Sequence, residues 1–105
     1  MKCMVEYRIR TGLSHDQNLA GHEALLKVFG TWKPETGLTV HAFLSNFNSG
    51  GYVLVEADDP GVIYSFVSKF FYWNDVNVVP VIDVTEGVTM GNASLAWARS
   101  ALGKN

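Results

Sequence analysis

The chain has 105 residues, of which 48% are hydrophobic and 17% charged. This composition predicts one globular domain with its own core and excludes an intrinsically disordered chain. The formal net charge is −2, from 8 basic and 10 acidic residues. Because the basic residues form no cluster, nucleic acid is not an expected partner.

The expected compartment is the cytoplasm. A single cysteine, Cys3, excludes an internal disulfide and is typical of a reducing environment. The opening segment MKCMVEYRIR has too short an apolar stretch for a secretory signal, and no run approaches the ~18 apolar residues of a membrane span. We therefore expect a soluble protein with no membrane partner.

The first two predicted elements are a strand and a helix. Residues 2–10 alternate between apolar and polar side chains, as in a half-buried strand. Ser14 and Gln17 then match a capping box, which predicts a helix ending near Gly30. His22 falls on the apolar stripe of this helix, where we expect a core histidine bonded to a backbone carbonyl.

The segment from Thr39 to Tyr72 predicts a strand, a tight turn, a second strand and a helix. The strands are TVHAFLSNF and YVLVEA, and the helix is VIYSFVSKFFY. We interpret Gly50-Gly51 as the source of the positive φ angles that the hairpin turn requires. Asp59 is the expected N-cap of the helix, with Pro60 at its first position.

The last predicted strand is VNVVPVIDV, in which Pro80 indicates a sheet edge. Residues 1–86 are thus predicted to form one domain, and residues 87–105 a C-terminal tail, helical from Asn92 to Leu102. The tail is expected either to cover the sheet edge beside Pro80 or to reach across to a second subunit.

The order βαββαβ predicts an α+β, ferredoxin-like fold, with an antiparallel four-stranded sheet and both helices on one face. Strand alternation assigns an apolar set to the helix side: Cys3, Val5, Tyr7, Ile9, Val40, Ala42, Leu44, Val53, Val55, Ala57, Val78 and Ile82. The opposite face is predicted to carry a mixed set: Met4, Glu6, Arg8, Arg10, Thr39, His41, Phe43, Ser45, Tyr52, Leu54, Glu56, Asn77, Val79, Val81 and Asp83. Because this second face is too apolar to remain in water, we expect a homodimer that forms through it.

The polar members of that second face are the candidate site residues. We expect Arg8, His41 and Tyr52 to line a ligand cavity, together with Glu6 and Glu56. The first hypothesis is a binding or sensing protein for a small apolar or carboxylate-bearing molecule. The second is an enzyme in which His41 or Glu56 removes a proton next to a carbonyl and Arg8 stabilises the enolate. The third is a structural partner subunit without a ligand.

No cofactor or metal is expected. The segment His22-Glu23 begins like a zinc-protease signature, but Leu26 occupies the position of the second histidine. A phosphate-binding glycine loop and a nucleophile elbow are both absent from the sequence.

Three segments carry a family resemblance: MKCMVEYRIR, GGYVLVEADDP and VNVVPVIDV. Together they resemble a family of small bacterial proteins of unknown function that is similar in pattern to the dimeric α/β-barrel superfamily. The resemblance covers roughly residues 2–84. It implies a dimer with a cavity either between helices and sheet or inside the barrel. That superfamily includes cofactor-free monooxygenases, muconolactone-type isomerases and stress-responsive barrels, but no catalytic motif of theirs can be placed on this chain.

Overall fold

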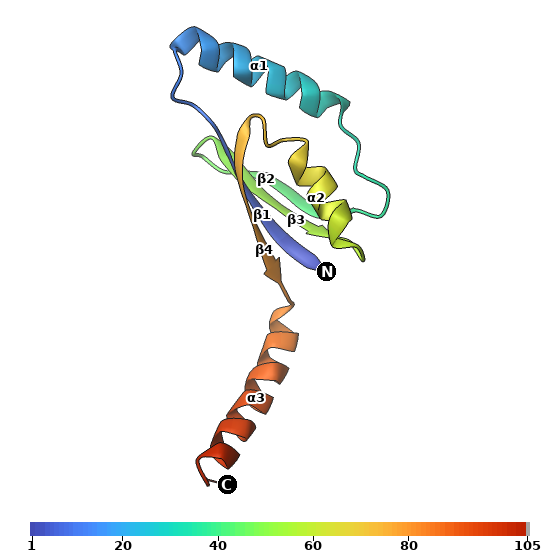
Figure 1. The fold of residues 1–105 in the computed structure, drawn as a ribbon, viewed down its shortest axis with the longest axis vertical. Coiled ribbons are helices and arrows are strands. Elements are labelled where there is room, and N and C mark those ends of the chain that lie inside the picture. Colours follow the sequence, from blue (N-terminus) through green and yellow to red (C-terminus); the bar gives the residue numbers. More distant parts are fainter. Residues whose placement is uncertain (105) are drawn as a thin grey trace.

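The computed structural model describes residues 1–104 and has the α+β, ferredoxin-like architecture that the sequence predicts (Figure 1). The elements are β1 (Lys2–Ile9), α1 (His15–Thr31), β2 (Thr39–Ser45), β3 (Gly50–Glu56), α2 (Pro60–Ser68), β4 (Asn74–Val81) and α3 (Val84–Ala101). The four strands form one antiparallel sheet in the order β2-β3-β1-β4. Pro80 therefore lies on an edge strand, as predicted.

Both predicted helix starts are confirmed. Ser14 Oγ accepts a hydrogen bond from the Gln17 backbone N–H at 3.2 Å, and Gln17 Oε1 accepts one from the Ser14 N–H at 3.2 Å. Asp59 caps α2 by accepting from the Gly61 N–H at 2.8 Å. These bonds satisfy amide donors that the first helical turn leaves unpaired.

The end of α1 differs from the prediction. The helix passes Gly30 and ends after Thr31, at Trp32, whose backbone is extended and whose N–H donates to Phe29 O at 3.1 Å. An exposed glycine inside a helix is only mildly unfavourable, so it did not stop this one.

The role predicted for Gly50-Gly51 was wrong. The positive φ of the hairpin belongs to Ser49, at 59°, and both glycines lie within β3. A Cβ on Gly50 would strike the carbonyl oxygen of Tyr7, and one on Gly51 would strike that of Leu44. These positions need glycine because neighbouring backbone approaches closely, not because the chain turns there.

A β-bulge in β2 changes which side chains face the helices. Val40 pairs with Val55, but Ala42 pairs with Leu54, so one extra residue, His41, lies between successive pairs. The extra residue reverses the alternation downstream of it. Phe43 and Ser45 therefore turn to the helix side, and Ala42 and Leu44 to the open face, opposite to the prediction for all four residues.

The core forms mainly between α2 and the sheet. Its buried residues are Cys3, Val5, Leu38, Val53, Val55, Ala57, Ile63, Phe66 and Val67. In contrast, α1 stands away from the sheet, and Leu25 is its only buried residue. Helix α2 therefore packs against the sheet, whereas space remains between α1 and the sheet.

The C-terminal helix α3 projects from the end of β4 and packs on no other part of the chain that the structure describes (Figure 1). It begins at Val84 rather than at the predicted Asn92, so Gly87 and Gly91 lie inside it. The molecule consequently extends over 65 × 31 × 20 Å.

We predict that Gly51→Ala lowers the free energy of unfolding by about 1–3 kcal/mol, because the added methyl group meets the Leu44 carbonyl and the Tyr7 side chain. Gly30→Ala is the control, since nothing lies within 4 Å of its Cβ position. It should raise that free energy by about 0.5–1 kcal/mol. Urea unfolding monitored by circular dichroism measures both, and equal effects would contradict the close-approach role.

Candidate functional site

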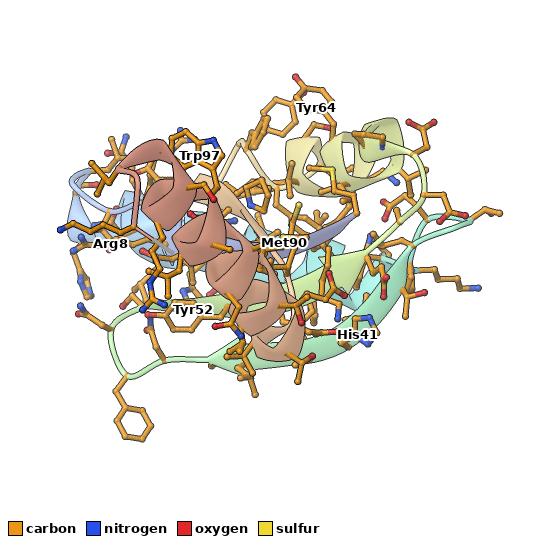
Figure 2. The ribbon with its side chains drawn as sticks, turned by 90° about the horizontal axis from the view of Figure 1, so that it is seen from below. Arg8, His41, Tyr52, Tyr64, Met90 and Trp97 are labelled. Carbon is orange, nitrogen blue, oxygen red and sulfur yellow. The ribbon has the colours of Figure 1, made fainter. Side chains whose placement is uncertain are left out.

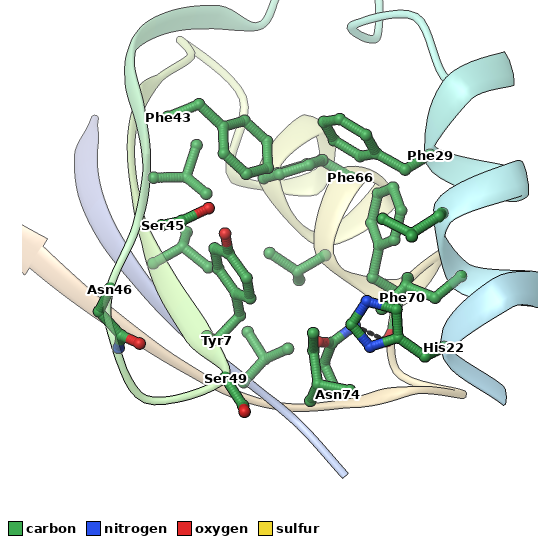
Figure 3. A pocket seen from close by; sticks show the side chains of 18 residues that line it. Tyr7, His22, Phe29, Phe43, Ser45, Asn46, Ser49, Phe66, Phe70 and Asn74 are labelled. Carbon is green, nitrogen blue, oxygen red and sulfur yellow. Dashed lines mark hydrogen bonds between the residues drawn. The ribbon is translucent and has the colours of Figure 1, made fainter. Parts of the chain in front are cut away.

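A cavity of about 510 Å³ lies between α1, α2 and the helix-facing side of the sheet (Figure 3). It exists because Ile63, Phe66 and Val67 of α2 are buried, whereas α1 buries only Leu25 and stands away from the sheet. Natural ligand sites fall in the range of roughly 300–1,000 Å³. This volume is therefore suited to a small molecule.

Aromatic side chains from four elements form much of the wall. Tyr7 comes from β1, Phe29 from α1, Phe43 from β2, and Phe66 and Phe70 from α2 and the turn after it. They meet mostly edge to face, with ring centroids 5.3 Å apart for Phe29 and Phe43. The bulge in β2 is what places Phe43 among them.

Asn74 is the most deeply buried polar group of the cavity, with 4% of its surface exposed. Its Nδ2 donates to Phe70 O at 3.1 Å, and its Oδ1 has no hydrogen-bond partner. From the sequence we interpreted Asn74 only as the break after a helix. Extending the alternation of Val76 and Val78 back by one step would have assigned it to the helix-facing side.

Other polar groups lie nearer the mouth of the cavity. His22 is exposed on α1 instead of buried in the core as predicted, and Figure 3 shows its ring on the α1 side of the cavity. Ser45 and Ser49 line the opposite side (Figure 3). The Tyr7 hydroxyl donates to Leu44 O at 3.3 Å.

The residues that the sequence singled out lie on the other face of the sheet and form two separate groups. Glu6 is paired across the sheet with Tyr52, and Arg8 follows two residues along β1. At the far end His41 Nε2 lies 2.8 Å from Glu56 Oε1. Strand register separates Arg8 from Glu56 by six residues, or about 20 Å. Figure 2 shows Arg8 and Tyr52 toward one side and His41 toward the other.

The His41–Glu56 contact has an electrostatic consequence. The hydrogen bond from His41 holds the pKa of the Glu56 carboxyl below its ordinary value of 4.5, and the charge of Lys2 acts in the same direction, whereas desolvation opposes them. Lys2 itself is paired with Asp83 at 3.0 Å, and this contact raises the pKa of Lys2. This end of the open face is therefore a small charged network at the start of α3.

Two further findings concern residues 1–104. No group of three or more His, Cys, Asp and Glu side chains is arranged to hold a metal ion. No helix in this range is long and apolar enough to cross a membrane.

Comparison with known proteins gives one match: the model of the domain of unknown function DUF3303 matches residues 1–95. The chain belongs to this family. The match spans the whole sheet, α1 and α2, and extends into α3. No curated protein and no solved structure matches the chain.

For this DUF3303 member we predict that His41→Gln raises the pKa of Glu56 toward that of an ordinary glutamate, because the hydrogen bond that lowers it is weakened. A lowered pKa stabilises the folded protein above pH 4.5, and the contribution is lost as the pH falls through the lowered value. NMR titration of the Glu56 carboxyl measures the midpoint. His22→Gln is the control and should leave it unchanged; an unaltered midpoint in His41→Gln would refute the coupling.

Proposed function

We propose that this protein binds a small, largely apolar molecule in the cavity between α1, α2 and the sheet, as a binding or sensing protein. The observation that carries the proposal is a cavity of about 510 Å³ walled by five aromatic side chains. The space opens to solvent, since Phe29 and Phe43 in its wall are exposed, and it is concave and mostly apolar. A concave, mostly apolar cleft of this size is the usual form of a small-molecule site.

The energetics of the cavity wall favour an apolar occupant. Phe29 and Phe43 remain 41% and 36% exposed although they belong to an aromatic cluster. Covering about 100 Å² of such surface contributes about 2.5 kcal/mol at roughly 25 cal/mol per Å². The resemblance to dimeric α/β barrels implies a cavity either between helices and sheet or inside the barrel, and the first of these two positions is that of this cavity.

A second candidate function is enzymatic, and the observation that favours it is the His41–Glu56 pair. A histidine oriented by a carboxylate is a common general base, and this one is accessible. In this reading a cofactor-independent monooxygenase or isomerase would bind a small aromatic or lactone substrate on the open face beside His41, whereas Arg8, about 20 Å from Glu56 along the strands, is too far to be its anion partner within one chain. The two candidates differ in which face holds the small molecule.

We predict that Ser45→Phe weakens binding of 2-methylnaphthalene at least about tenfold, because the new ring occupies the cavity. Ser65→Phe introduces the same side chain on the exposed side of α2 and should leave binding unchanged. Titration followed by tryptophan fluorescence measures both affinities. Equal affinities of the wild type and Ser45→Phe would show that the probe does not bind in the cavity, and would favour a site on the open face.

We also propose that the protein is a homodimer that forms through the open sheet face. Apolar side chains on that face are Met4, Ala42, Leu44, Leu54, Val79 and Val81. No helix within residues 1–104 covers them, and a contiguous apolar patch of this kind usually marks an interface. In this assembly Arg8, Tyr52 and His41 lie at or beside the subunit contact.

Helix α3 belongs to the same proposal. Its exposed apolar side chains are Val84, Val88, Met90, Leu95, Trp97 and Leu102, and its only charged residues are Glu86 and Arg99. Figure 2 shows Met90 and Trp97 on α3, and Trp97 is 72% exposed. A helix of 18 residues is about 27 Å long, so two reciprocal contacts would enlarge the area that the sheet faces bury.

We predict that wild-type protein has twice the 11.6 kDa mass of one chain in multi-angle light scattering. Leu54→Asp on the open face and Leu95→Asp on α3 should each shift it to the mass of one chain, because a buried carboxylate opposes association. Leu19→Asp on the exposed side of α1 is the control and should remain dimeric. A wild type with the mass of one chain at all concentrations would overturn the dimer.

A further inference from the structure

Two hydroxyl groups of the cavity wall come from one row across the sheet. Ser45 pairs with Gly51, and Gly51 pairs with Tyr7, so the three residues lie side by side on β2, β3 and β1. A Cβ on Gly51 would lie 2.5 Å from the Tyr7 hydroxyl oxygen, which shows that the Tyr7 side chain passes over the glycine toward β2. Its hydroxyl reaches the carbonyl oxygen of Leu44, the residue before Ser45, at 3.3 Å. The Tyr7 and Ser45 hydroxyls therefore share the space that the missing side chain of Gly51 leaves.

Both hydroxyls are accessible and can donate to a further acceptor. Ser45 is exposed, and its hydroxyl makes no hydrogen bond within residues 1–104. The bond from Tyr7 to Leu44 O is also exposed, and its 3.3 Å exceeds the about 2.7–2.8 Å that is usual for O–H···O. Because solvent can hydrate both groups, a ligand that covers them must replace the water as their partner, or it loses affinity.

The rest of the cavity wall limits the chemistry of such a ligand. The Tyr7 and Phe43 rings meet edge to face with centroids 5.8 Å apart, and Phe43 meets Phe29 in the same way at 5.3 Å. The two hydroxyls thus adjoin an aromatic surface. No aspartate, glutamate, lysine or arginine of the described chain lines the cavity. His22 lies on α1, across the cavity from Ser45 (Figure 3), so a charged group beside the two hydroxyls would have no ionic partner.

We propose that Tyr7 and Ser45 bind the carbonyl oxygen of a neutral, mainly apolar ligand, such as an aromatic ketone. A carbonyl oxygen has two lone pairs and no hydrogen, so it can accept from both hydroxyls and leaves no group of its own unpaired. The apolar body of the ligand then lies against the aromatic rings. This inference rests on the proposed function, because it specifies the chemistry of the molecule that the same cavity binds.

The test compares three probes of similar shape on the wild-type protein by isothermal titration: 2-acetylnaphthalene, 2-isopropenylnaphthalene and 2-naphthoate. The first two differ only in that a carbonyl oxygen replaces a methylene group. The ketone should bind about 5- to 30-fold more tightly than the alkene, because the alkene would cover both hydroxyls without pairing them. Naphthoate should bind more weakly than the ketone, since its charge has no ionic partner in the cavity.

Two variants and two matched controls assign the preference to the hydroxyls. Tyr7→Phe and Ser45→Ala should each lower the advantage of the ketone at least about threefold and leave the affinity for the alkene nearly unchanged. Tyr64→Phe and Ser65→Ala make the same changes on the exposed side of α2, outside the cavity, and should keep the full advantage. The carbonyl stretching frequency of the bound ketone is a direct readout. It should rise in Tyr7→Phe and in Ser45→Ala, because each substitution removes one donor.

The outcomes separate this inference from the function on which it rests. Equal affinities of the ketone and the alkene for the wild type would overturn the carbonyl site and leave the apolar cavity site intact. An advantage that survives in both Tyr7→Phe and Ser45→Ala would also overturn it, as would tighter binding of naphthoate than of the ketone. Failure of all three probes to bind would overturn both proposals. The comparison on the wild type decides the question even where a variant does not fold.

Discussion

The bulge at His41 is the constraint on which the rest of this structure depends. One extra residue between Val40 and Ala42 reverses the alternation of β2, so that Phe43 joins the aromatic wall and Leu44 joins the open face. Without the bulge, Phe43 would point away from the cavity and Leu44 would fill part of it. The bulge also leaves His41 on the open face, where it reaches Glu56. This single bulge therefore determines which side chains of β2 lie on each face of the sheet.

The two faces of the sheet differ in what covers them: helices lie over the helix side, and the open face is uncovered in the part of the chain that the structure describes. On the helix side, α2 completes a conventional core with β1 and β3, whereas α1 encloses space. On the open side, apolar side chains alternate with ionisable ones, and α3 adds a further uncovered apolar surface. In the proposed assembly the helix side binds a small molecule and the open face binds a second subunit. Both proposals follow from apolar surface that one chain leaves uncovered.

The candidate site was only partly accessible from the sequence. Arg8, Tyr52, Glu6, His41 and Glu56 were found by alternation, and all five do lie on the open face. Antiparallel register divides them into two groups, with Arg8 about 20 Å from Glu56, and residue types alone do not specify this division. Asn74 was missed because an asparagine after a helix is ordinarily a turn residue. Its significance depends on burial and on an amide oxygen without a partner, and both are properties of packing.

The sequence by itself determined the local features: the capping box of α1, the Asp59 cap of α2, the hairpin, the edge position of Pro80 and the order of the elements. Each of these depends on hydrogen bonds or steric limits that act within a few neighbouring residues. The tertiary structure decided which side chains of β2 face the helices, the need for glycine at Gly51, the start of α3 and the distance of α1 from the sheet. Those features depend on which backbone lies opposite, so no local pattern in the chain encodes them.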